Sequence, residues 1–151
     1  MTESPRILII DDDEAIRRTL STILEEKGYI IDTAKSAEEA IKKSASAYYN
    51  LALIDIKLPD IEGIDLLNKL QEISPEMIKI ILTGYPSLQN AVKAVNRGAD
   101  GYLIKPVNID DLHKMIKKHL KRQEEERRYS EEKVAEFIES RVKEIRTSRK
   151  C

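Results

Sequence analysis

Short apolar segments that end abruptly in polar residues alternate with helix-patterned segments along the first 120 residues, and this alternation limits the folds available to the chain. The most constrained segment is Leu51–Ile54, which Asp55 follows directly. Such a run, bounded by turn-forming residues, predicts a strand buried on both faces. Asp55 therefore stands at the carboxyl end of a strand, where open α/β sheets bind ligands. Taken alone, Asp55 is better explained as a turn cap, because Asp is a common turn residue.

Four further segments fit the same strand pattern: Arg6–Ile10, Tyr29–Ala34, Ile78–Leu82 and Gly101–Ile104. Helical spacing of apolar residues, or a capping signal such as Ser36, marks the segment after each strand. Five strands that alternate with five helices predict an α/β fold, in which helices cover both faces of a parallel sheet through right-handed crossovers.

The helix expected after the fourth strand has a regular apolar stripe. Its members recur at positions i, i+3, i+4 and i+7 and are Leu88, Ala91, Val92 and Val95. Such spacing predicts an amphipathic helix, and Gly98 is placed to end it.

Bulk composition excludes several classes of protein. The chain has 151 residues and a net charge of −1, so no strong field draws it to nucleic acid or to an anionic membrane. Its apolar runs are far shorter than the roughly 20 residues of a spanning helix, and no signal-peptide core is evident. The single cysteine, Cys151, allows no disulfide framework. We expect a cytoplasmic protein without membrane association.

The last thirty residues differ in composition, and we place a domain boundary after residue 122, giving segments 1–122 and 123–151. Residues 121–151 hold 10 Lys or Arg and 8 Asp or Glu. Residues 121–128 contain no apolar side chain and read as exposed helix or linker. Ser130 then resembles a new helix start. An apolar stripe follows, formed by Val134, Phe137, Ile138, Val142 and Ile145.

A helix of about four turns is marginal alone, so this stripe should pack against something. A self-paired coiled coil, and hence a homodimer, is our first expectation. Packing on the chain's own first domain is the second, and docking to another protein the third. The segment is too short for a helix-turn-helix domain, so we expect no direct binding of nucleic acid by this chain.

Polar side chains gather where the predicted strands end. These residues are Asp11, Asp12, Asp55, Thr83 and Lys105. Three carboxylates in one crevice repel each other, so they must bind protons or a cation. Oxygen ligands without His or Cys suit Mg²⁺. A cation, a lysine and a hydroxyl around a carboxylate are the parts needed to transfer a phosphoryl group to Asp55.

These motifs, in this order and spacing, resemble the receiver domain of two-component response regulators, of the chemotaxis-regulator type. The resemblance covers residues 4–122. It rests on the acidic pair after the first strand, Asp55-Ile56-Lys57-Leu58-Pro59-Asp60, Thr83-Gly84 and Lys105-Pro106. It implies a flavodoxin-like sheet with strand order 2-1-3-4-5.

The resemblance also implies a role for each acidic residue. Asp55 would accept the phosphoryl group from the phosphohistidine of a sensor histidine kinase or a phosphotransfer protein. Asp12 and Asp55 would hold Mg²⁺, or Mn²⁺, directly, together with the backbone carbonyl of Lys57. Asp11 would act partly through water.

The remaining implied roles concern the switch. Lys105 would pair with phosphoryl oxygens, Thr83 would hydrogen-bond another, and Gly84 would leave room for the donor. A cis bond is usual between the residues matching Lys105 and Pro106. Tyr102 matches the aromatic residue that responds to Thr83 and alters the face of the fourth helix, fifth strand and fifth helix.

Two other functions remain open on the sequence. One is a phosphatase resembling the haloacid dehalogenase superfamily, with Asp11 as nucleophile and Asp13 as acid, although no cap or later acidic pair is visible. The other is a scaffold that no longer takes phosphate. We favour a signalling module that is not an enzyme on other substrates, capable at most of self-phosphorylation from small donors and of autodephosphorylation.

Overall fold

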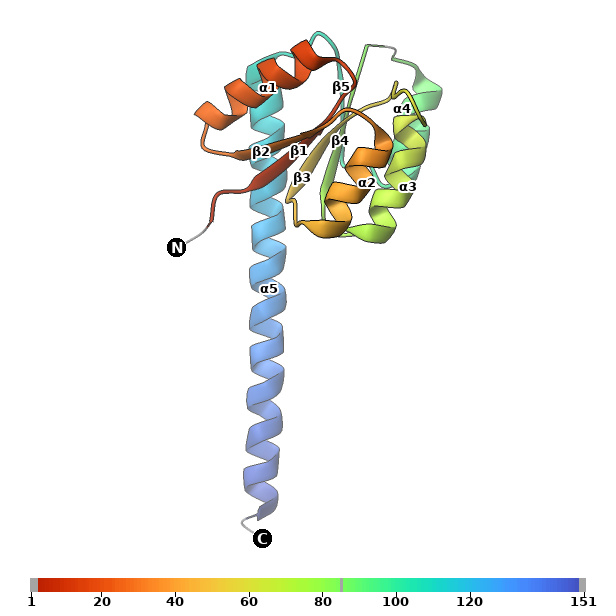
Figure 1. The fold of residues 1–151 in the computed structure, drawn as a ribbon. Helices are drawn as coiled ribbons and strands as arrows, with labels where there is room; N and C mark the ends of the chain where they lie inside the picture. Colours follow the sequence, from red (N-terminus) through yellow and green to blue (C-terminus); the bar gives the residue numbers. More distant parts are fainter. Residues whose placement is uncertain (1–2, 85, 150–151) are drawn as a thin grey trace. The chain divides into compact units, whose positions relative to one another are not determined.

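Five strands and five helices alternate strictly in the computed structural model, which describes residues 3–84 and 86–149 (Figure 1). Cys151 lies outside the described residues. In chain order the elements are β1 (Arg6–Ile10), α1 (Glu14–Glu26), β2 (Ile30–Ala34), α2 (Ala37–Ser46), β3 (Leu51–Asp55), α3 (Gly63–Ile73), β4 (Ile78–Thr83), α4 (Leu88–Asn96), β5 (Gly101–Ile104) and α5 (Ile109–Arg149).

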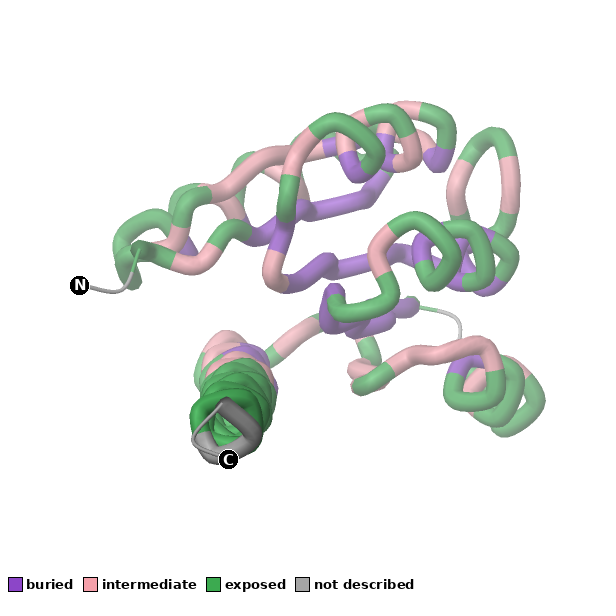
Figure 2. The backbone as a smooth tube through the Cα atoms, turned by 90° about the horizontal axis from the view of Figure 1, so that it is seen from below, coloured by how far each residue is buried: buried purple, intermediate pink, exposed green. Residues whose placement is uncertain are grey.

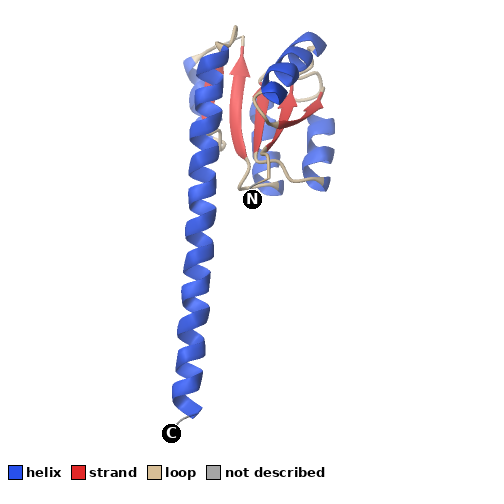
Figure 3. Ribbon diagram, turned by 90° about the vertical axis from the view of Figure 1, so that its left-hand side faces the viewer, coloured by secondary structure: helices blue, strands red, loops and turns tan. Residues whose placement is uncertain are grey.

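The strands, drawn in red in Figure 3, form one parallel sheet. Their order is β2-β1-β3-β4-β5, which confirms the expected flavodoxin-like topology. The register aligns the carboxyl ends of neighbouring strands. Ile10 pairs with Ile54, Asp55 with Leu82, and Thr83 with Ile104. Residues that follow different strands therefore meet at one edge of the sheet.

Alternate side chains of the central strands enter two separate apolar cores, as the pleat of a strand requires. Leu8, Ala52 and Ile81 face the core covered by α2, α3 and α4. Ile9, Leu53 and Ile80 face the core covered by α1 and by the part of α5 up to Leu120. The three central strands β1, β3 and β4 are consequently the most buried strands, whereas β2 and β5 at the edges of the sheet are only partly buried (Figure 2).

Local capping explains where several helices begin and end. Asp13, Ser36 and Ser87 are the N-caps of α1, α2 and α4, and each side chain accepts a backbone N–H of the first turn. Gly28 follows α1 with φ of 98°, a left-handed conformation that favours glycine.

The apolar stripe of α4 exists but does not face the core. Ala94 is the buried residue of this helix, whereas Leu88, Val92 and Val95 are 81%, 50% and 64% exposed. Ile104 on β5 is also 55% exposed. Because α4 packs against the core through the small side chain of Ala94, its larger apolar residues form part of the protein surface.

The chain divides into two compact units, Met1–Leu120 and Lys121–Cys151. The helix start expected at Ser130 is absent, because α5 continues without a break to Arg149. Residues 121–128 are strong helix formers, and ion pairs of Glu124 with Arg127 and Arg128 support the helix there. None of the helices in the described part of the chain has the length and apolar character needed to cross a membrane.

Gly63 permits a close approach between α3 and the end of β3. A Cβ atom at this position would lie 2.2 Å from the backbone oxygen of Asp55. We predict that Gly63→Ala lowers the free energy of unfolding by about 1–3 kcal/mol, because backbone must shift to make room. Urea denaturation measures this. The control is Gly84→Ala, whose Cβ would meet nothing within 4 Å; equal midpoints for the two variants would contradict the prediction.

Candidate functional site

Three carboxylates converge at the carboxyl edge of the sheet. Asp11 and Asp12 follow β1, and Asp55 is the last residue of the adjacent β3. One carboxylate oxygen from each residue lies within 4.8 Å of the other two. Asp11 and Asp55 are buried, whereas Asp12 is exposed. The structure thus brings together the acidic residues that the sequence predicted to meet.

Lys105 supplies the positive charge of this cluster. Its Nζ lies 2.7 Å from Oδ2 of Asp11 and 3.5 Å from Oδ2 of Asp55. The backbone N–H of Lys105 donates to the carbonyl of Thr83, and the Lys105–Pro106 bond is cis, as the resemblance implied. Burial lowers the pKa of Lys105, but Asp11 and then Asp55 outweigh that effect and raise it overall. Lys105 therefore remains charged.

The environment of Asp55 disfavours its ionised form. Burial raises the pKa of its carboxyl group, and the negative charge of Asp11 raises it further. Lys105 and a backbone hydrogen bond from Lys57 to Oδ1, 3.2 Å long, act in the opposite direction without cancelling the shift. The carboxylate of Asp55 is thus short of compensating positive charge.

Thr83 and Tyr102 lie on the neighbouring strands. Thr83 is fully buried at the end of β4. Tyr102, on β5, packs against the core beneath α2, α3 and α4. Its buried hydroxyl has no hydrogen-bond partner among residues 3–84 and 86–149. The orientation of the Tyr102 ring is therefore not fixed by a hydrogen bond from its hydroxyl to any of these residues.

Two residues that support the acidic loops were not identified from the sequence. Arg17 on α1 donates from Nη1 to the backbone carbonyl of Asp11 over 2.7 Å. Asp60, in the loop after β3, accepts the backbone N–H groups of Ala37 and Glu38 at 3.0 and 2.9 Å. These hydrogen bonds to the start of α2 lower the pKa of Asp60. Its place in the β3 motif was visible, but its distant partners were not.

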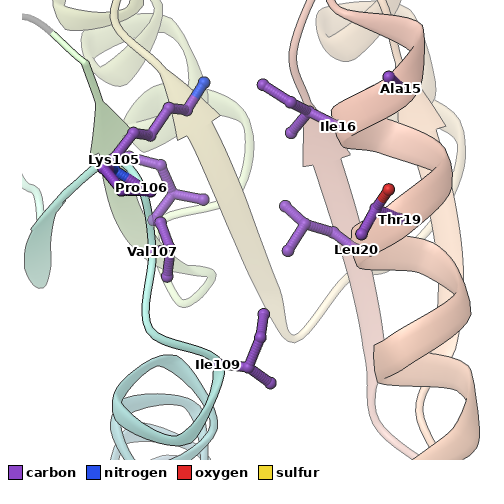
Figure 4. Close-up of a pocket in the computed structure, with 9 residues that line it drawn as sticks. Ala15, Ile16, Thr19, Leu20, Lys105, Pro106, Val107 and Ile109 are labelled. Carbon is purple, nitrogen blue, oxygen red and sulfur yellow. The ribbon is translucent and has the colours of Figure 1, made fainter.

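An apolar groove of about 570 Å³ opens beside the acidic cluster, between α1 and the segment that follows β5 (Figure 4). Lys105 contributes to both the groove and the cluster. The groove is lined by Ala15, Ile16, Thr19, Leu20, Leu82, Lys105, Pro106, Val107 and Ile109.

The side-chain donors of the cluster fit a hard divalent cation. All three are carboxylate oxygens, and they gather within 4.8 Å around a buried edge of the sheet. Mg²⁺ prefers oxygen ligands and commonly uses one or two carboxylates. A divalent cation would also relieve the repulsion that disfavours ionised Asp55.

A doubly wound sheet with an acidic cluster and a lysine at its carboxyl edge defines a class of α/β domains that bind their ligands at the switch point of the sheet. Comparison with known proteins makes the class specific. The sequence model of the response regulator receiver domain matches residues 7–117. The chain belongs to the response regulator receiver family.

Relatives and solved structures agree with this assignment. The two-component response regulator PhoP of Pseudomonas aeruginosa is 32% identical over 117 residues, which are 78% of this chain and 52% of PhoP. The regulatory protein AtoC of Escherichia coli is 32% identical over 123 residues, but these are only 27% of AtoC. The chain thus spans about a quarter to a half of these relatives.

Two solved structures are informative. A CheY-like receiver domain protein from Methanospirillum hungatei JF-1 is 50% identical with a TM-score of 0.80, covering 82% of this chain and 98% of its own. A response regulator from Burkholderia pseudomallei is 31% identical with a TM-score of 0.73, covering 82% of this chain and 73% of its own. That structure contains a phosphorylated aspartic acid, a calcium ion and citrate.

We predict that Asp55→Asn stabilises the metal-free protein at pH 7. Since folding raises the pKa of Asp55 above its usual value of 3.8, the ionised group penalises the folded state. This penalty is complete above the folded pKa and is lost as the pH falls through it. The gain in the urea midpoint should therefore shrink on acidification towards about pH 4.

Asp13→Asn is the matched control for this measurement. Asp13 lies outside the carboxylate cluster and caps α1, a task that asparagine performs equally well. It should give no comparable gain. A gain for Asp55→Asn that is the same at every pH would contradict the electrostatic explanation.

We further predict that Lys105→Met increases the affinity for Mg²⁺ by roughly tenfold or more. The ammonium group competes with a cation for Asp11 and Asp55, and its removal leaves three carboxylates without that charge. Isothermal titration calorimetry measures the effect. Lys57→Met removes an exposed side chain and should change the affinity far less. Weaker binding by Lys105→Met would refute the competition.

Proposed function

We propose that Asp55 accepts a phosphoryl group from the phosphohistidine of a sensor histidine kinase or phosphotransfer protein, and that the bound group switches the domain. The observation that carries the proposal is the placement of Lys105 and two further carboxylates around the carboxylate of Asp55. The Burkholderia relative with a phosphorylated aspartic acid and a calcium ion supports it.

In this reaction a carboxylate oxygen of Asp55 attacks phosphorus as the phosphorus–nitrogen bond of the donor breaks. Asp12, Asp55 and the backbone carbonyl of Lys57 would hold Mg²⁺, or Mn²⁺, with Asp11 acting partly through water. The cation would supply positive charge for the phosphoryl oxygens. Lys105 already lies 3.5 Å from Asp55 and would turn from Asp11 towards the new anion.

The proposed switch couples Thr83 to Tyr102. Thr83 would donate its hydroxyl to a phosphoryl oxygen, and the Tyr102 ring would move into the space released. Inverting a 1:99 equilibrium needs about 5.5 kcal/mol. Charge-assisted contacts through Thr83 and Lys105, at roughly 1.5–3 kcal/mol each, reach that range.

The exposed apolar residues of α4 and β5 support an output role for the α4-β5-α5 face. Leu88, Val92 and Val95 on α4 and Ile104 on β5 offer a surface to an output domain or partner. A change in the Tyr102 side chain, on the same strand as Ile104, would alter this surface.

The groove beside Lys105 is suited to the phosphodonor protein. Its apolar lining from α1 and from the segment after β5 adjoins the acceptor carboxylate, so a helix that presents a phosphohistidine could pack there. The chain would then act as a signalling module that modifies itself rather than a separate substrate. A single cysteine is in keeping with a cytoplasmic location.

The haloacid dehalogenase alternative receives no support from the comparisons. The matching family and the solved relatives are receivers. The carboxylate of Asp13, which that alternative needs as an acid, accepts the backbone N–H groups of Ala15 and Ile16 as the cap of α1.

Incubation with Mg²⁺ and acetyl phosphate, followed by intact-mass analysis, tests the proposed acceptor. We expect a gain of one phosphoryl group that is stable to acid and labile to base. Asp55→Asn should abolish the gain, and Asp13→Asn should retain it. Rapid turnover that depends on Asp11 but not on Asp55 would instead indicate a phosphatase, and the absence of any reaction would indicate a scaffold.

A further inference from the structure

The unit formed by residues 121–151 exposes a continuous apolar stripe on α5. Val134, Ile138, Val142 and Ile145 are spaced by four, four and three residues, so they share one face of the helix. Their exposed fractions are 58%, 56%, 40% and 54%. Phe137 borders the stripe and is 64% exposed. An apolar face of this length is typical of a helix that pairs with a partner.

Charge is distributed unequally along this stripe. Residues 131–139 contain four Glu and one Lys, a net charge of −3, whereas residues 140–146 contain three Lys or Arg and one Glu, a net charge of +2. The acidic half and the basic half are thus complementary. A second copy of the same helix, laid in the reverse direction, would match each half with its opposite.

Charges beside the stripe discriminate between the two orientations of a helix pair. Glu132 and Arg146 lie on one flank, and Arg141 lies on the other. In a parallel pair opposite flanks meet, so Arg141 would face Arg146 of the second copy. In an antiparallel pair like flanks meet, so Glu132 would face Arg146 of the second copy at two symmetric contacts. Glu139 and Arg141, near the centre of the pair, would each face their own counterpart. Within residues 131–146 the parallel pair thus has only repulsion beside the stripe, whereas the antiparallel pair offsets its central like-charge contacts with two Glu132–Arg146 attractions.

We propose that residues 131–146 pair with a second copy of this chain as an antiparallel helix pair. Val134 would pack near Ile145 of the second copy, and Ile138 near Val142, which covers the stripe on both helices. Opposed helix dipoles favour the same orientation. The association uses residues outside the phosphoryl-acceptor site and is independent of the proposed phosphorylation.

Sedimentation equilibrium of the full chain, without a phosphodonor, tests whether the stripe mediates pairing. We expect a monomer–dimer equilibrium that Ile138→Glu shifts strongly towards monomer. Ser140→Glu, on the opposite side of the helix, places the same charge two residues away and should leave the equilibrium unchanged. A wild-type monomer at all accessible concentrations, or a dimer that resists Ile138→Glu, would overturn the proposal.

Charge reversal tests the orientation. Arg146→Glu and Glu132→Arg should each weaken the dimer, by roughly fivefold to tenfold over its two symmetric contacts, and the double variant should recover most of the loss. Added salt should also weaken the wild-type dimer. A stronger dimer for Arg146→Glu, or one strengthened by salt, would show parallel pairing and overturn the antiparallel arrangement.

A distance measurement provides a second readout. A spin label at Ser130→Cys, in a Cys151→Ser background, should lie about 30 Å along the helix axis from its counterpart in the antiparallel pair, since the two labels are offset by roughly 20 residues at 1.5 Å each. Parallel helices would place the labels side by side. That shorter separation would equally overturn the proposed orientation.

Discussion

Repulsion among three carboxylates at one edge of the sheet is the constraint on which the rest of the receiver unit depends. Asp11 and Asp55 are buried there beside exposed Asp12, and burial together with the charge of Asp11 makes folding with an ionised Asp55 costly. Lys105 offsets part of that cost through contacts with both buried carboxylates. It comes from a position 94 residues after Asp11 in the chain, and only the parallel sheet brings the two together.

The sequence was sufficient to predict this part of the molecule because buried parallel strands have a simple pattern. Each central strand is a short apolar run, and the polar residue that ends the run marks its carboxyl end. Since the carboxyl ends of parallel strands share one edge, Asp55 and Lys105 could be placed together without any knowledge of helix packing. The strand boundaries followed closely for the same reason, with β2 starting at Ile30 rather than Tyr29.

Features set by distant packing could not be predicted. The stripe on α4 had the period of a core-facing helix, but the core accepts Ala94, and Leu88 and Val95 remain outside. The period of the apolar residues shows that a helix has an apolar face. It does not show whether the core of the same chain or another molecule covers that face. The prediction of a new helix start at Ser130 was wrong for a different reason. A serine followed by glutamates resembles a cap, yet continuous helix formers on both sides make interruption unfavourable. The contacts of Arg17 and Asp60 were missed because their backbone acceptors or donors have no sequence signature.

The hydrogen bonds of Asp60 connect the loop after β3 with the start of α2. Its carboxylate accepts the first backbone amides of α2, while its own backbone belongs to the loop that follows β3. Opening of the first turn of α2 and loosening of this loop are therefore thermodynamically linked. Any ligand that fixes the loop would therefore slow hydrogen exchange at the backbone amides of Ala37 and Glu38. A ligand bound at the edge of the sheet would in this way make the start of α2 more rigid without contacting it.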